Sequence, residues 1–186
     1  MGKIIFITGG ARSGKSTFAE KLLKNEDSVV YIAAGIAFDS EMKDRIARHK
    51  EKRNPAWITV EKYKDLDIIL KEIIKDKKFI LIDCLTIMVS NLMILENDID
   101  WDTIDIKTVN IIEENILAEI NKLLITVNDF PGESIIVSNE TGMGVVPPAP
   151  LGRYYRDIAG RINQVVAAAA HTAYFIVSGI PMKIKG

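Results

Sequence analysis

Eight consecutive residues near the start of the chain have the types and the spacing of a phosphate-binding loop. Gly9 is followed, after four residues, by Gly14, Lys15 and Ser16. Gly9 and Gly14 permit backbone angles that turn successive N–H groups toward one anion. Lys15 would lie against the β and γ phosphates of a nucleotide, and the Ser16 hydroxyl would ligate Mg²⁺. The predicted nucleotide site is Gly9, Gly10, Ala11, Arg12, Ser13, Gly14, Lys15 and Ser16.

The residues on either side of this loop distinguish it from an ordinary glycine-rich turn. An apolar run at 3–8 predicts a strand before the loop, and the pattern at 17–23 predicts a helix after it. A helix that begins at the loop adds unpaired N–H donors and the positive end of its dipole. Spacing and flanking elements therefore agree on a phosphate site.

Asp83 is a second candidate at the nucleotide site, because it lies within the apolar run at 79–86. In phosphate-loop proteins a buried strand of this kind ends in an acid that holds the metal ion or its water. The alternative is an Asp that only caps the next helix. The sequence alone leaves both readings open, and the loop favours the first.

A basic segment surrounds the histidine at position 49. Six basic residues and two acidic residues lie between positions 43 and 53. If this segment is helical, Arg45 and Arg53 flank His49 at four residues on either side. Nearby positive charge disfavours the imidazolium, so we expect a neutral, nucleophilic His49 that could carry a phosphoryl or nucleotidyl group. The alternative is a solvated basic helix with an incidental histidine.

The other histidine and the cysteine are expected to be structural. Cys84 lies in an apolar run and has no second cysteine to pair with, so its expected role is packing. His171 follows four alanines and precedes an apolar strand, which favours a structural role. Two histidines and one cysteine make a structural zinc site improbable.

Composition bounds the class of protein. The 186 residues are 48% hydrophobic, which is typical of one globular domain over 1–186. A net charge of −1 argues against general nucleic-acid binding. No uncharged apolar run approaches 18 residues, and the first residues resemble a strand and not a signal peptide, so we expect no membrane span and a cytoplasmic protein.

Strand and helix patterns alternate along the chain, which predicts an α/β fold with a mostly parallel sheet covered on both faces. In such a fold the site lies at the carboxyl ends of the strands. A loop at 139–150 with three prolines is long enough to cover a site, although it could be an ordinary surface loop. Strands are expected at 3–8, 28–34, 56–60, 79–86, 134–138, 173–177 and 181–185, and helices at 17–23, 40–52, 66–75, 85–95, 106–128 and 152–170.

Several motifs, taken in order, resemble one enzyme family. They include GGARSGKS at 9–16, YIA at 31–33, SNETGMGVVP at 138–147, YRDIAGRINQ at 155–164 and VSG at 177–179. The chain resembles the bifunctional adenosylcobinamide kinase/adenosylcobinamide-phosphate guanylyltransferase family over nearly its whole length. Arg48 stands where members often have a second histidine, and Asp83 stands where they often have Glu.

The resemblance implies a three-layer P-loop NTPase fold of the RecA-like kind and a homotrimer. It implies that His49 takes GMP covalently from GTP, and that ATP or GTP phosphorylates adenosylcobinamide. Ser16 and Asp83 are the ligands that the loop and the strand before Cys84 predict for Mg²⁺. Adenosylcobinamide phosphate would then accept the GMP to give adenosylcobinamide-GDP. Beyond the loop, the resemblance associates these residues with GTP: Ala33, Ala34, Lys50, Glu51, Lys52, Arg53, Glu61 and Asp83.

Two other functions remain open at this point. A small-molecule kinase without nucleotidyl transfer would have the same phosphate loop and a basic helix that is only surface. A RecA-like ATPase acting on a macromolecule would also have the loop, although the net charge and the short chain count against it. Arg153, Arg156, Arg161 and the loop at 141–150 are candidates for contacts with substrate or with another subunit.

Overall fold

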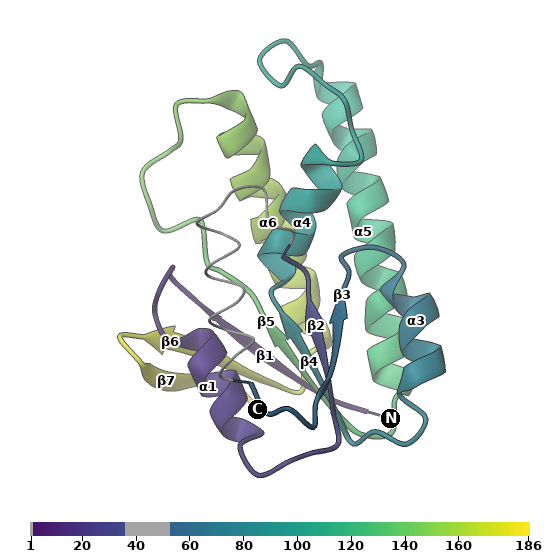
Figure 1. The fold of residues 1–186 in the computed structure, drawn as a ribbon. Helices are drawn as coiled ribbons and strands as arrows, with labels where there is room; N and C mark the ends of the chain where they lie inside the picture. Colours follow the sequence, from purple (N-terminus) through teal and green to yellow (C-terminus); the bar gives the residue numbers. More distant parts are fainter. Residues whose placement is uncertain (1, 36–52) are drawn as a thin grey trace.

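One sheet of seven strands forms the centre of the molecule (Figure 1). The structure is a computed structural model, and it describes residues 2–35 and 53–186. In these ranges the strand order is β3-β2-β4-β5-β1-β6-β7, and β7 alone pairs antiparallel, with β6. The mostly parallel sheet is therefore confirmed. The strands are β1 (Lys3–Gly9), β2 (Val29–Ala33), β3 (Ile58–Glu61), β4 (Phe79–Asp83), β5 (Glu133–Val137), β6 (Thr172–Val177) and β7 (Ile180–Lys185).

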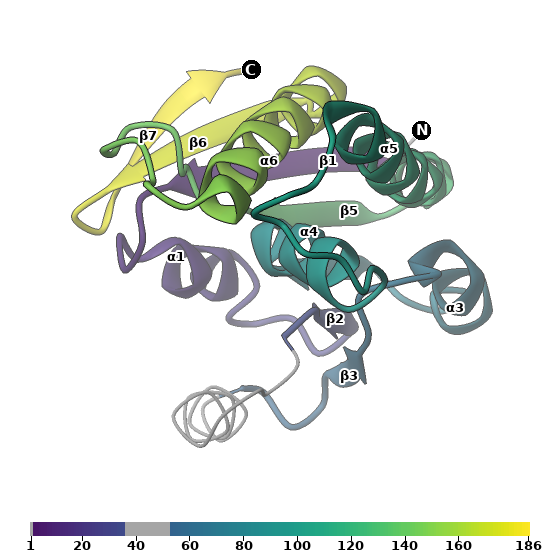
Figure 2. The same ribbon diagram turned by 90° about the horizontal axis from the view of Figure 1, so that it is seen from above.

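Helices cover both faces of this sheet. Alternate residues of β1 divide between two buried clusters: Ile4 and Phe6 pack in one, and Ile5 and Ile7 in the other. Side chains of α3, α4, α5 and α6 pack in the first cluster, and Ala19 of α1 packs in the second. Figure 2 shows α1 and α5 on opposite sides of the sheet. The described helices are α1 (Lys15–Leu22), α3 (Leu66–Ile73), α4 (Leu85–Ile94), α5 (Ile106–Asp129) and α6 (Pro150–Ala169).

These layers confirm the three-layer α/β architecture. The long helix α5 matches its expected pattern, with Val109, Ile112 and Ile116 buried on one side. Within the described ranges, no helix combines the length and the apolar character that a membrane crossing needs.

Several element boundaries differ from expectation by one to three residues; β4, for example, ends at Asp83 and not at 86, and α1 begins at Lys15 and not at 17. The strand expected at 56–60 begins at Ile58, because Asn54 accepts hydrogen bonds from the N–H groups of Ala56 and Trp57 and folds those residues into a turn. The helix expected at 152–170 begins at Pro150, whose ring is compatible with a first helical turn that needs no N–H partner. The helix expected at 40–52 lies outside the described residues.

Candidate functional site

The phosphate loop connects β1 to α1 with the geometry that its glycines predict. Gly9 has φ 147° and Gly14 has φ 97°, both in the region that favours glycine. A Cβ on Gly9 would lie 2.4 Å from the carbonyl oxygen of Ile176 in β6. Gly179 N–H also donates to the Ser13 carbonyl at 2.8 Å, so the hairpin between β6 and β7 supports the loop.

Lys15 lies against the backbone of this loop. Its side chain is buried, and Nζ donates to the Gly10 carbonyl oxygen at 2.6 Å. Burial lowers the pKa of the Lys15 ammonium, and the nearby Asp83 carboxylate acts in the opposite direction. Ser16 follows as the second residue of α1, so its hydroxyl belongs to the first turn of this helix.

Asp83 ends β4, on the carboxyl side of the sheet. It pairs with Val137 of β5, which in turn pairs with Ile7 of β1, so one strand separates Asp83 from the strand that leads into the phosphate loop. Tyr31 of β2 donates its hydroxyl to Asp83 Oδ2 at 3.0 Å. One carboxylate oxygen is thereby oriented by protein, which is how a ligand of a metal ion or its water is commonly fixed.

Tyr31 is a site residue that the sequence reasoning missed. Its side chain is buried, and burial, with a further contribution from Asp83, raises the pKa of the phenol. The Tyr31 ring stacks on Trp57 with centroids 6.3 Å apart. An aromatic hydroxyl inside an otherwise aliphatic strand was the signal that could have identified it.

Arg53 lies over the Tyr31 ring. Its guanidinium carbon lies 3.4 Å from the ring centroid, and Nη1 donates to Thr59 Oγ1 at 3.0 Å. The Arg53 Nε is buried and has no hydrogen-bond partner among the described residues. The structure thus places this predicted nucleotide ligand in a stack with Tyr31 and Trp57. His49, Lys50, Glu51 and Lys52 lie outside the described residues.

The other predicted residues lie on neighbouring strand ends. Ala33 of β2 pairs with Glu61 of β3 on one side and with Asp83 of β4 on the other. The Ala34 carbonyl accepts a hydrogen bond from Asn91 Nδ2 at 2.7 Å. The fold therefore brings Ala33, Ala34, Glu61 and Asp83 to the edge of the sheet that carries the phosphate loop.

A polar cluster that the sequence reasoning did not predict supports the loop after β5. Ser138 Oγ donates to Asn163 Oδ1 at 2.6 Å, and Asn163 Nδ2 donates to the Asn139 carbonyl at 2.9 Å. Asn139 Nδ2 donates to Thr86 Oγ1 at 2.9 Å. Buried polar groups satisfied in this way rigidify the elements that they join, here α4, β5 and α6. The signal in the sequence that could have identified this cluster was Thr86 and Asn163, two polar residues on helix faces that are otherwise apolar.

Cys84 and His171 have structural positions. Cys84 is buried in the cluster on the α1 side, and its Sγ lies 3.2 Å from Thr86 Oγ1 in a hydrogen bond. The backbone N–H of Ile4 donates to His171 Nδ1 at 3.1 Å, and the backbone N–H of His171 donates to the Ile4 carbonyl at 2.9 Å. This histidine therefore extends the pairing along β1, which confirms its structural interpretation.

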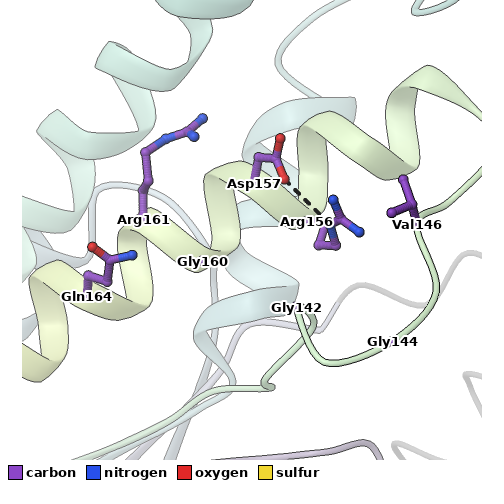
Figure 3. A pocket seen from close by; sticks show the side chains of 8 residues that line it. All are labelled: Gly142, Gly144, Val146, Arg156, Asp157, Gly160, Arg161 and Gln164. Atoms are coloured by element: carbon purple, nitrogen blue, oxygen red, sulfur yellow. Dashed lines mark hydrogen bonds and ion pairs between the residues drawn. The ribbon is translucent and has the colours of Figure 1, made fainter.

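The three candidate arginines have different environments. Arg153 Nη1 donates to the carbonyl groups of Pro147 and Pro148, so it fastens the loop that precedes α6. Arg161 forms a bidentate ion pair with Glu113 of α5. Arg156 lines a pocket between α6 and the loop, where its one ion pair in the described structure is a long contact of 3.5 Å with Asp157 (Figure 3).

Comparison with known proteins agrees with this geometry. A family model described as "Cobinamide kinase / cobinamide phosphate guanyltransferase" matches residues 5–184. The "Bifunctional adenosylcobalamin biosynthesis protein CobU" of Escherichia coli K12 is 43% identical over 183 residues, which cover 98% of this chain and 99% of that protein. The "Bifunctional adenosylcobalamin biosynthesis protein CobP" of Pseudomonas aeruginosa is 38% identical over 181 residues, which cover 97% and 96%.

A solved structure supports the fold alone. It is titled "Structural study of Project ID PH0250 from Pyrococcus horikoshii OT3" and matches with a TM-score of 0.56 at 9% identity, over 99% of this chain and 86% of that one. The family model and the two relatives instead match the chain along nearly its whole length. On that evidence the chain belongs to the family of cobinamide kinases / cobinamide phosphate guanyltransferases.

Proposed function

We propose that this protein phosphorylates adenosylcobinamide with ATP or GTP and then transfers GMP from GTP to adenosylcobinamide phosphate. The observation that carries the proposal is the phosphate loop, with Lys15 Nζ fixed 2.6 Å from the Gly10 carbonyl and Asp83 one strand away. In the first step, the substrate hydroxyl attacks the γ-phosphorus and the nucleoside diphosphate leaves. Lys15 neutralises charge that develops on the phosphoryl group.

The second step uses His49 as the nucleophile. A neutral imidazole nitrogen forms a bond to the α-phosphorus of GTP, and the bond to the departing pyrophosphate breaks. A phosphate oxygen of the acceptor then forms the new pyrophosphate bond, and protonated imidazole leaves. The basic residues around His49 in the sequence support this role, since they favour a neutral ring and attract the triphosphate.

Ser16 and Asp83 are the residues that would hold Mg²⁺. Among the described residues no group of three or more His, Cys, Asp or Glu side chains could hold a metal ion. One hydroxyl and one carboxylate, from Ser16 and Asp83, suit Mg²⁺, because this ion keeps several waters and binds through one or two carboxylates together with substrate phosphates. When bound, the ion neutralises charge on the phosphates.

We also propose a cytoplasmic homotrimer that binds no nucleic acid. The nucleoside triphosphates that it consumes support the location, and a net charge of −1 argues against nucleic acid. The apolar side chains Ile180, Met182 and Ile184 of the edge strand β7 are more than half exposed, which supports association between chains. Sedimentation equilibrium tests the trimer, and a monomer at micromolar concentration would contradict it.

Trapping the covalent intermediate tests the reaction. Incubation with α-labelled GTP and Mg²⁺ should place an acid-labile, base-stable label on the wild-type protein, because a P–N bond has those stabilities. The label should vanish in His49→Ala. A label that persists in that variant assigns the nucleophile elsewhere, and an unlabelled wild type with intact kinase activity points to a small-molecule kinase.

Lys15→Ala gives a second arm of this experiment. Because the same loop serves both steps, loss of the ammonium should suppress both the label and the kinase reaction. His49→Ala should suppress the label alone. Nucleotide hydrolysis that DNA stimulates and a corrinoid does not would favour an ATPase acting on a macromolecule.

A further inference from the structure

The pocket between α6 and the loop at 139–149 has a composition suited to one kind of ligand. Its volume is about 440 Å³, and three of the residues that line it are glycines without side chains, at positions 142, 144 and 160. The lining is completed by Val146, Arg156, Asp157, Arg161 and Gln164. Sites for small molecules combine apolar surface with a few convergent polar groups in this way.

Arg156 is the cation available to a ligand here. Figure 3 shows Arg156 on the side of α6 that faces Gly142, while Arg161 projects away from the loop. Arg161 is neutralised by its bidentate pair with Glu113. Among the residues that the structure describes, the Arg156 guanidinium contacts one carboxylate, that of Asp157 at 3.5 Å, which is too long for a strong bond. Its guanidinium therefore retains donors for an anionic group.

The loop beside the pocket presents apolar side chains to solvent. Met143, Val145 and Val146 are 79%, 94% and 57% exposed, so they contribute little to the core. Three neighbouring apolar side chains at this exposure indicate a contact surface. A flat ligand with one anionic end could lie over them with that end at Arg156.

Hydrogen bonds connect this pocket to the phosphate loop. The Glu140 N–H donates to the Gly9 carbonyl at 2.9 Å, and Glu140 Oε1 accepts from the Gly142 N–H at 2.7 Å. Glu140 thereby joins the first residue of the pocket to the first glycine of the phosphate loop. The loop that lines the pocket is therefore fixed to the phosphate loop.

We propose that this pocket docks the corrinoid acceptor, with Arg156 binding the phosphate of its phosphorylated form and the side chains of residues 143, 145 and 146 lying against the ring. This inference rests on the proposed function, since it names the binding site of that function's substrate. The pocket is smaller than a whole corrinoid, so it holds the phosphorylated arm while the ring remains over the loop. Charge complementarity and the connection to the phosphate loop favour this occupant over a second copy of the chain.

Binding measurements with two acceptors test the assignment. Equilibrium dialysis, read by the visible absorption of the corrin, gives the Kd for adenosylcobinamide and for its phosphate. Arg156→Ala should raise the Kd of the phosphate by about tenfold or more, because a charge-assisted hydrogen bond is lost. It should raise the Kd of the unphosphorylated acceptor by less than about threefold, since the charged partner is absent. Equal changes for the two acceptors, or none, would overturn the role of Arg156.

Val145→Ser tests the apolar surface independently. It should raise the Kd of both acceptors by about threefold, because a contact with the ring loses apolar area. Ile111→Ser is the matched control, since Ile111 is 56% exposed on α5 and does not line the pocket. If Val145→Ser changes the sedimentation of the protein and leaves both Kd values unchanged, the surface is a contact between chains and the proposal is wrong. A wild type that forms no GMP adduct instead contradicts the proposed function.

Discussion

The site depends on residues that are fixed by neighbours outside the phosphate loop. Asp83 accepts from Tyr31, and the Tyr31 ring contacts both Arg53 and Trp57. The Tyr31 hydroxyl thus has its orientation set by a stack of three side chains. A carboxylate held in this way needs less reorganisation when it binds a metal ion or its water.

Tyr31→Phe tests that arrangement. The ring stays in its stack, but the donor to Asp83 is lost, which costs about 0.5–1.5 kcal/mol. If Asp83 serves Mg²⁺, the half-saturating Mg²⁺ concentration of the labelling reaction should rise about two- to tenfold. Tyr63→Phe removes a similar bond, from the Tyr63 hydroxyl to Glu96 at 2.9 Å, and should leave the Mg²⁺ dependence unchanged. Equal effects of the two changes would contradict the role of Tyr31.

The Cys84 thiol provides a pH-dependent prediction. Burial raises the pKa of this thiol, and the Asp83 carboxylate beside it raises it further. The thiolate fraction at pH 8 should therefore be small in the folded protein, and a disulfide reagent should react slowly. Unfolding in urea should make the reaction fast and stoichiometric, because this is the single cysteine of the chain. Rapid reaction of the folded protein would show that the thiol is accessible and ionised.

At the scale of elements, the ends of strands and helices determine where functional groups lie. The phosphate loop turns between β1 and α1 through positive φ values at Gly9, Arg12 and Gly14. Asp105 caps helix α5, and its side chain accepts from the N–H groups of Lys107 and Thr108 at 2.9 and 3.1 Å. Single substitutions in the loop or at Asp105 can therefore test how each boundary is formed.

Gly9→Ala should destabilise the protein and its loop together. The added Cβ meets the Ile176 carbonyl at 2.4 Å and strains a backbone at φ 147°. We expect a cost of about 1–3 kcal/mol, seen as a lower Tm. Gly10→Ala is the matched control for stability, since a Cβ there has no neighbour within 4 Å. A Tm for Gly9→Ala equal to that of the control would contradict the loop geometry.

Asp105→Ala should lower the Tm at neutral pH and have no effect in strong acid. Hydrogen bonds from the Thr108 hydroxyl and from the N–H groups of Thr108 and Lys107 hold the pKa of Asp105 below its usual 3.8. A lowered folded pKa contributes stability that is complete above the unfolded value and is lost as pH falls through the folded value. Thermal melts from pH 7 to pH 2 measure this difference. Glu114→Ala, at an exposed position within α5, is the control, and a difference in Tm that persists at the lowest pH would contradict capping by the carboxylate.

At the scale of the whole molecule, one sheet joins the two faces on which the helices pack. Trp57 lies in the buried cluster on the α1 side, and Trp101 packs against the cluster on the α5 side. The strands between them contribute side chains to both clusters. We therefore expect the chain to unfold as one domain.

Single-tryptophan variants measure this cooperativity. Trp101→Phe leaves Trp57 as the fluorescent reporter, and Trp57→Phe leaves Trp101. Urea transitions of the two reporters, each compared with circular dichroism of the same variant, should coincide, because a shared sheet cannot lose one face and keep the other. Separate midpoints within one variant would divide the chain into two units.

Much of the fold and part of the site could be predicted from local patterns. The phosphate loop was recognisable because its glycines, lysine and serine act within eight residues, and the family resemblance from the motifs was confirmed by the comparisons. The start of β3 was placed two residues early, since the turn closed by Asn54 competes with a run of strand-forming residues. Tyr31, Thr86 and Asn163 were missed because their partners are distant in the sequence.

The sequence by itself determined the chemistry of the loop, the alternation of strands and helices, and the family. Only the tertiary structure decided that β5 separates β1 from β4, that Glu140 reaches Gly9, and that Arg53 lies on Tyr31 while Arg156 faces the pocket. The physical reason is that a glycine's permitted angles and a strand's apolar pattern act over a few neighbouring residues. Strand order and side-chain partners instead depend on contacts that form when segments more than a hundred residues apart pair in one sheet.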